Sequence, residues 1–235
     1  IFSTEFSLKV MGDIQQYFID PYSESKYKAE LKVQEFIAAG GEANVFRIGT
    51  IGASSLTGIF QKNIHENYFT RLINSIINLK MAPYLPNYNQ DYLPVDIVSN
   101  SIISLSLLRT NRTYHIYNSN TFSLYEMCLM LQAIGYQVNL VDYNDYQKKV
   151  VDVAEKYKLL DHIGGIGEIL DHHNITTPKL DCKYTQDILL KLGIEFPKPN
   201  IIQITNLIKC GIELGYFKEP NYWGMFKPVN TQQMG

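Results

Sequence analysis

Two residue types that together can transfer a proton stand four positions apart near the start of the chain, Tyr22 and Lys26. On a helix, residues i and i+4 lie one above the other, so both side chains can point into one pocket. A lysine ammonium beside a phenol favours the phenolate and lowers the pKa of the tyrosine towards the working pH. The pair therefore has the chemistry of a general acid that protonates a developing alkoxide.

The spacing is unspecific by itself, because a chain with 17 tyrosines also produces it by chance. Its surroundings carry more information. Residues 1–8 have the character of a strand end, and the sequence then predicts a helix over 22–39 and a buried strand over 43–51. A glycine- and serine-rich loop follows up to Gly58, where backbone can approach a ligand closely.

The rest of the chain alternates between the two kinds of element. Ser123 and Glu126 have the spacing of a capping box, and Asp96 is predicted to be a helix N-cap. We expect a loop over 81–94 and a mostly helical pattern from about residue 144. The sequence further predicts helices over 66–80, 97–108 and 124–134, and strands over 114–118 and 137–141. This alternation predicts an α/β domain with a parallel sheet and a smaller helical part.

Composition excludes several classes of protein. A hydrophobic content of 46% permits a packed core, and a net charge of -2 gives no reason to expect nucleic acid as a partner. The sequence contains no apolar run of about 18 residues, the length that a membrane-spanning helix needs. Three scattered cysteines favour a reducing compartment, and we expect a cytoplasmic protein.

Several histidines and Arg47 are further candidates for a functional site. Asp161–His162 and Asp171–His173 lack a recognised ligand spacing, since adjacent histidines on a helix point in different directions, so we predict no metal site. Lone His115 is interpreted as structural. Arg47 leaves a buried strand, and we predict that it forms a structural hydrogen-bonded pair rather than a substrate contact.

Several blocks that follow one another in a fixed order resemble the extended short-chain dehydrogenase/reductase family. The likeness is strongest to the male-sterility-type thioester reductase domains of polyketide synthases, nonribosomal peptide synthetases and carboxylic acid reductases. The blocks are FST (2–4), YSESKYKAE (22–30), RIGTIGASSLTG (47–58), LPVDIVSNSI (93–102), YHIYN (114–118) and LQAIGYQVNLVDY (131–143). The order of these blocks is far more specific than any single one.

The resemblance implies the C-terminal part of a Rossmann-type parallel sheet with a smaller, mostly helical substrate-binding subdomain. Residues 1–143 would form the partial catalytic domain, interleaved with substrate-subdomain segments from about 52–95. Residues 144–235 would form the helical substrate-binding part. Because the chain opens at Ile1 in what resembles mid-strand, we expect a segment of a longer polypeptide whose preceding half holds the cofactor phosphates. We therefore expect the isolated chain to bind NADPH weakly or not at all.

The resemblance also implies roles for individual residues. Thr4 would hydrogen-bond the reacting carbonyl oxygen, Tyr22 would donate the proton, and Lys26 would hold the nicotinamide ribose and tune the tyrosine. The residues implied to contact the cofactor are Tyr22, Lys26, Gly49, Thr50 and Ile51. Two positions depart from the family pattern, Pro21 where glycine is common and Tyr146 where tryptophan is common.

The implied reaction is the NADPH-dependent reduction of an acyl thioester. The acyl group would be held on the phosphopantetheine arm of an acyl carrier protein domain, and the product would be an aldehyde or, after a second round, an alcohol. Two alternatives remain open at this point. The chain could be another extended short-chain reductase, an epimerase or a fatty acyl-CoA reductase, or it could be a non-catalytic remnant without the cofactor-phosphate site.

Overall fold

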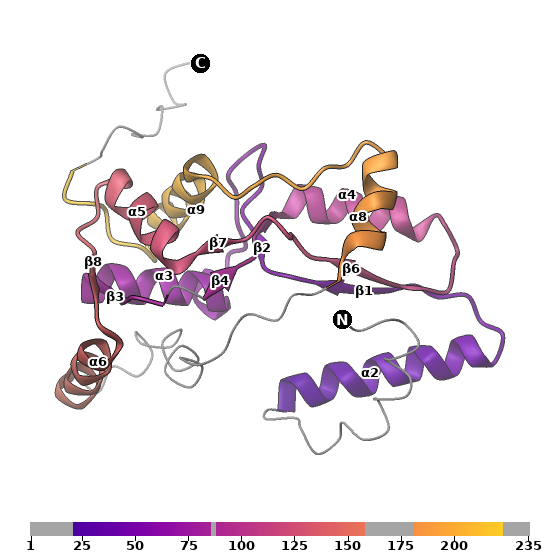
Figure 1. Cartoon of the computed structure of the whole chain (residues 1–235), viewed down its shortest axis with the longest axis horizontal. Coiled ribbons are helices and arrows are strands. Elements are labelled where there is room, and N and C mark those ends of the chain that lie inside the picture. The colour runs from indigo at the N-terminus through magenta and orange to yellow at the C-terminus, as the bar shows by residue number, and fades with distance from the viewer. Residues whose placement is uncertain (1–20, 86–87, 158–180, 223–235) are drawn as a thin grey trace. The chain divides into compact units, whose positions relative to one another are not determined.

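A computed structural model describes residues 21–85, 88–157 and 181–222 of the chain (Figure 1). The described residues divide into two compact units that the chain visits alternately. The first unit contains the described parts of Ile1–Gly49, Ile97–Ser119 and Pro178–Pro197, and the second contains those of Thr50–Asp96, Asn120–Thr177 and Lys198–Gly235. The predicted division into a catalytic and a substrate-binding part concerns function, and it stays a prediction.

The first unit is built on one pair of parallel strands. Val45 of β1 lies opposite Thr113 of β6, and Ile48 lies opposite Ile116. Parallel strands need a long crossover, and here the chain passes through the second unit before it returns. The elements of this unit are α2 (Pro21–Ala38), β1 (Val45–Ile48), α4 (Val95–Ser106, whose first two residues belong to the second unit), β6 (Thr113–Ile116) and α8 (Lys183–Lys191).

The second unit combines helices with three short strand pairs. Its elements are β2 (Ile51–Gly52), η2 (Ile64–Glu66), α3 (Tyr68–Leu79), β3 (Met81–Pro83), β4 (Asn89–Gln90), β5 (Leu93–Pro94), β7 (Phe122–Ser123), α5 (Leu124–Ile134), β8 (Asn139–Val141), α6 (Tyr143–Tyr157) and α9 (Ile201–Glu213). Strand β2 pairs with β5 and β3 with β8 in parallel, whereas β4 and β7 are antiparallel. None of the helices in the described ranges is both long and apolar enough to cross a membrane.

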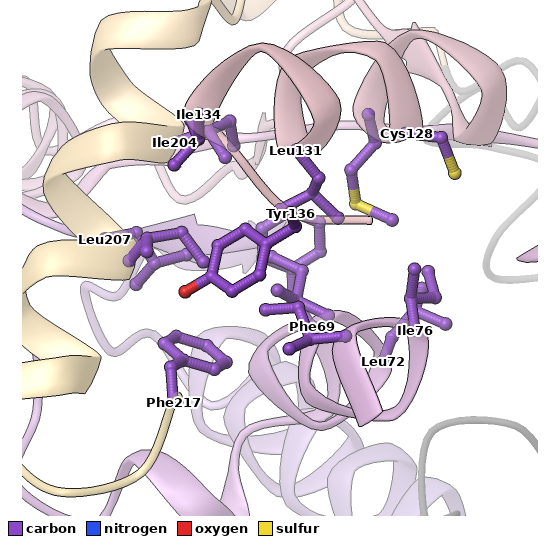
Figure 2. Packing of buried hydrophobic residues seen from close by; sticks show 14 of the residues in the cluster. Phe69, Leu72, Ile76, Cys128, Leu131, Ile134, Tyr136, Ile204, Leu207 and Phe217 are labelled. Atoms are coloured by element: carbon purple, nitrogen blue, oxygen red, sulfur yellow. The ribbon is translucent and has the colours of Figure 1, made fainter. Parts of the chain in front are cut away.

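The core of the second unit lies between α3, α5 and α9, which each turn an apolar face inward (Figure 2). Fully removing one such side chain from water contributes roughly 1.5–3 kcal/mol, so these helices stabilise the unit mainly by packing. The residues that Figure 2 labels in this core are Phe69, Leu72, Ile76, Cys128, Leu131, Ile134, Tyr136, Ile204, Leu207 and Phe217.

Local sequence signals predicted the helices well. The helix over 124–134 is confirmed with its capping box, in which Ser123 Oγ accepts from the Glu126 amide while the Glu126 carboxylate accepts from the Ser123 amide. Gly135 ends this helix with a positive φ of 118°, a conformation that favours glycine. The α/β class is also confirmed, because parallel strand pairs alternate with helices in both units.

Two expectations about local structure were wrong. The segment 81–94, expected to be a loop, contains β3, β4 and β5, which pair with strands far away in the sequence. Asp96 is not an N-cap, because α4 begins at Val95 and the Asp96 carboxylate accepts hydrogen bonds from Ser55 instead. Both errors have the same origin, since a partner remote in sequence outweighs a local preference.

Two buried tyrosines of the second unit differ in whether the hydroxyl has a partner. Tyr136 donates to the carbonyl oxygen of Lys218 at 2.5 Å, whereas the fully buried hydroxyl of Tyr146 has no hydrogen-bond partner among the residues described. We expect Tyr146→Phe to raise the free energy of unfolding by about 1 kcal/mol, because it removes an unsatisfied polar group. Tyr136→Phe should lower it by about 1 kcal/mol, because a hydrogen bond is lost.

Urea denaturation of both variants beside the wild type measures this difference. An equal loss of stability in the two variants would contradict the assignment of Tyr146 as unsatisfied.

Candidate cofactor and catalytic site

The predicted catalytic residues lie at the start of the first unit, and the structure describes only part of them. Helix α2 contains Tyr22 and Lys26, so the predicted helical spacing of the pair is confirmed, and Lys26 is exposed. The side chain of Tyr22 and the whole of Thr4 lie outside the described residues. Convergence of these three side chains on one point therefore stays a prediction.

The predicted strand over 43–51 is divided at the predicted cofactor residues. Strand β1 ends at Ile48, and the Gly49 amide donates to the carbonyl oxygen of Ile116 at 3.0 Å, which keeps Gly49 with the first unit. Strand β2 begins at Ile51 and pairs with β5 in the second unit. The chain thus changes pairing partner between Gly49 and Ile51, where the sequence predicted one continuous strand.

A buried carboxylate holds Thr50 at this change of partner. The amide of Thr50 donates to Asp91 Oδ2 at 2.9 Å, and its hydroxyl donates to Asp91 Oδ1 at 3.0 Å. In return, the amide of Leu93 donates to the carbonyl oxygen of Thr50 at 2.9 Å. Burial raises the pKa of Asp91, and the two hydrogen bonds from Thr50 oppose that rise because they favour the ionised form.

This arrangement limits what Thr50 can offer to a ligand. Both of its donors already bind Asp91, so Thr50 can present only acceptor atoms and its methyl group. Such a surface fits an amide or ribose group that itself donates hydrogen bonds. The residues of the loop that could hold the nicotinamide end of a cofactor are Gly49, Thr50 and Ile51.

A second buried contact fixes the residues after the loop. Tyr92 is 1% exposed, and its hydroxyl accepts a hydrogen bond from the amide of Ala53 at 3.1 Å. Its ring packs so closely on Gly52 that a Cβ atom at residue 52 would lie 1.9 Å from Tyr92 Cζ. Gly52 is therefore required here by this close approach, which the sequence showed only as one glycine among several.

A third contact holds the start of the glycine- and serine-rich loop. The Asp96 carboxylate accepts from the Ser55 amide at 2.7 Å and from the Ser55 hydroxyl at 2.5 Å. Partial burial pushes the pKa of Asp96 upward, but the hydrogen bonds from Ser55 outweigh it and leave the pKa below the ordinary value. Asp91, Tyr92 and Asp96 thus all support the segment 50–55 from one neighbouring stretch.

The hydrogen-bonded pair predicted for Arg47 is confirmed. Its guanidinium forms two hydrogen bonds with Glu30 of α2, Nη2 to Oε1 at 2.6 Å and Nε to Oε2 at 3.1 Å. His115 lies opposite Arg47 in the strand pair, and burial together with the positive charge of Arg47 lowers its pKa. His115 therefore serves as a neutral member of the strand pair at pH 7, consistent with the structural role that the sequence predicted.

The roles of Asp91 and Tyr92 were not predicted from the sequence. Their one visible signal was a position just before the Leu93–Pro94 block, in a stretch interpreted as a loop. The predicted non-ligand segments Asp161–His162 and Asp171–His173 lie outside the described residues, so that prediction is not tested.

We expect Thr50→Val to lower the free energy of unfolding at neutral pH by about 1.5–3 kcal/mol, because it removes a hydrogen bond to a buried carboxylate. The hydrogen bond favours the ionised form, so its contribution is present above the pKa of Asp91 and is lost as the pH falls through it. Urea denaturation from neutral to acidic pH measures the effect. Thr57→Val, at an exposed position of the same loop, is the control. A difference in the free energy of unfolding between wild type and Thr50→Val that grows on acidification would contradict the hydrogen bond from Thr50 to ionised Asp91.

Part of this chain is similar in sequence to known proteins. Residues 3–102 match the NAD-binding family model described as male sterility protein. The nonribosomal peptide synthetase asaC of Aspergillus flavus is 29% identical over 130 residues, which cover 53% of this chain and 12% of that protein. The chain thus spans about an eighth of the length of this curated relative.

Two solved structures share the fold. The terminal R domain of the myxalamid polyketide synthase–nonribosomal peptide synthetase pathway superposes with a TM-score of 0.74 at 22% identity, covering 88% of this chain and 52% of that one. A thiolation-reductase di-domain of an archaeal nonribosomal peptide synthetase gives a TM-score of 0.74 at 22% identity, covering 86% and 42%. Residues 3–102 are therefore similar to the male sterility NAD-binding family, and the Rossmann-type α/β fold of the chain is that of the terminal reductase domains of these synthases.

Proposed function

We propose that this chain is the catalytic and substrate-binding part of an NADPH-dependent thioester reductase at the end of a peptide or polyketide synthase. The observation that carries the proposal is the position of Tyr22 and Lys26 one turn apart on α2, in the unit whose strand β1 leads into Gly49. The matched reductase domains support it, because they share the fold in which such a pair is expected.

The proposed roles follow from charge and reach. Four residues of helix advance about 6 Å along the axis, which leaves the long Lys26 side chain within reach of a phenol on the preceding turn. The Lys26 ammonium lowers the cost of forming the phenolate, so Tyr22 acts as the general acid. Thr4 donates a hydrogen bond to the reacting carbonyl oxygen and keeps it at the position that Tyr22 protonates.

Bound NADPH would supply the hydride. Gly49, Thr50 and Ile51 would line its nicotinamide end, with Thr50 contributing acceptor atoms because both of its donors bind Asp91. The hydrogen bonds from Thr50 to Asp91 and from Ala53 to Tyr92 keep this loop in one conformation before the ligand binds. This reduces the entropy lost on binding.

The substrate is proposed to be an acyl thioester on the phosphopantetheine arm of a carrier domain. The thiolation-reductase di-domain, with which this fold superposes, supports a carrier partner. Collapse of the reduced thioester releases the thiol and an aldehyde, and a second reduction would give the alcohol. We place the reaction in the cytoplasm, where the free thiols of Cys128, Cys182 and Cys210 stay reduced.

We expect Tyr22→Phe in the full-length protein to abolish reduction of an acyl-pantetheine thioester, with a loss of about 100-fold or more in kcat, because the proton donor is removed. Carrier binding should be unchanged. NADPH oxidation, followed by absorbance with product identified by mass spectrometry, measures the rate. Tyr27→Phe, five residues further along the same helix and on a different face from Tyr22, should keep the wild-type rate.

The alternatives predict other outcomes in the same assay. Turnover of a sugar nucleotide in place of the thioester would support an epimerase-like enzyme and contradict this proposal. Full activity of Tyr22→Phe would show that another group donates the proton.

A further inference from the structure

Helix α2 buries few of its side chains in the first unit. None of its side chains that the structure describes is fully buried, and Phe36 is 55% exposed. Most stable helices in a domain are held by an apolar face that packs on a core. Apolar burial along α2 is therefore too limited to set the position of the helix, and specific polar contacts must contribute.

The proposed proton donor and its lysine share one face of α2 with Glu30, a carboxylate that forms an ion pair. Tyr22, Lys26 and Glu30 follow at intervals of four, so their Cβ atoms lie on one side of the helix. Glu30 is the most enclosed of the ion-pairing carboxylates on this helix, with a side chain 15% exposed, and its partner Arg47 is 34% exposed. The surface pair of Lys32 and Glu35 on the same helix is 77% and 65% exposed.

The contact between Glu30 and Arg47 fixes direction as well as distance. Both carboxylate oxygens accept from the guanidinium, at 2.6 Å and 3.1 Å. A two-point contact between a planar fork and a carboxylate defines orientation far better than a single point charge does. Because the pair is partly enclosed, water and salt screen it less than they screen the exposed pairs of α2.

Arg47 belongs to the paired strand β1 and lies two residues before Gly49 of the proposed cofactor loop. It is the third residue of β1, where it stands opposite His115 of β6. Two residues later the Gly49 amide is bound to Ile116 of the same neighbouring strand. A displacement of α2 relative to Arg47 is thus also a displacement relative to Gly49.

We propose that Glu30 and Arg47 are positioning residues for the reduction, whose ion pair sets the place of the Tyr22 and Lys26 face of α2 relative to the strand that leads into the cofactor loop. The inference rests on the proposed function. Breaking the pair moves Tyr22 and Lys26 together, since both belong to one helix, and leaves their spacing unchanged. The reduction rate then falls, but its dependence on pH, which comes from the charge of Lys26 acting on the proton of Tyr22, is retained.

The kinetic test uses the full-length protein with NADPH and an acyl-pantetheine thioester. Glu30→Gln is expected to lower kcat by about tenfold or more per folded molecule, because small displacements of a proton donor are costly. The KM for thioester should change by less than about threefold, since the contact acts on the transition state. The alkaline midpoint of the pH profile should stay where it is in the wild type.

Two further variants separate positioning from stability. Glu30→Asp keeps the charge but shortens the side chain, so it is expected to preserve the unfolding midpoint while lowering kcat. The exchanged pair Glu30→Arg/Arg47→Glu should recover part of the kcat that either single change loses. Glu35→Gln makes the same chemical change in the exposed pair of the same helix, and kcat should stay within about twofold of the wild type.

A measurement without turnover reports the position of the helix directly. Spin labels at Ala29→Cys on α2 and Leu107→Cys, both exposed positions of the first unit, give a distance distribution between the helix and the end of α4. Glu30→Gln should broaden or shift this distribution, and Glu35→Gln should not.

The outcomes distinguish the inference from the function beneath it. A wild-type enzyme that reduces the thioester, with Glu30→Gln equally fast per folded molecule or with an unchanged label distance, overturns the positioning role and leaves the function intact. A wild-type protein that reduces no thioester overturns both. Loss of kcat together with a shifted alkaline midpoint would show that Glu30 acts on Lys26 or Tyr22 by charge, which also overturns the positioning role.

Discussion

The change of pairing partner between Gly49 and Ile51 is the constraint on which the described structure depends. Up to Gly49 the chain is held by β6 of the first unit, and from Thr50 it is held by Asp91 and β5 of the second. The buried Asp91 carboxylate stabilises the break between the two strands because it satisfies the amide and hydroxyl of Thr50 there. Two units therefore meet in sequence at the residues proposed to contact the cofactor.

The two units are stabilised in different ways. In the second, α3, α5 and α9 bury large apolar side chains, and the polar clamps of Asp91, Tyr92 and Asp96 act on a loop supported by that core. In the first, none of the described side chains of α2 is fully buried, and two hydrogen bonds join Glu30 of this helix to Arg47 of β1. Such a pair contributes modestly to overall stability but strongly to geometry, which is what proton transfer requires.

Much of the fold could be predicted from local signals. The Ser123–Glu126 capping box and the terminal Gly135 defined α5 residue by residue, because each signal acts within one turn of helix. The spacing of Tyr22 and Lys26 placed both on one helix for the same reason. Arg47 was predicted to be paired because a guanidinium at the end of a buried strand needs an acceptor, although its partner could not be named.

The sequence alone determined the helices, the α/β class and the likeness to reductase domains, because these depend on short-range spacing and on ordered blocks of residues. Only the tertiary structure decided that the predicted strand over 43–51 divides at Thr50, that 81–94 forms three strands, and that Asp96 binds Ser55 rather than capping α4. In each case the deciding partner lies more than thirty residues away, as Asp91 does from Thr50. Contacts at that separation leave no periodic trace in the chain, since the free energy that selects them comes from burial and hydrogen bonding in the folded state.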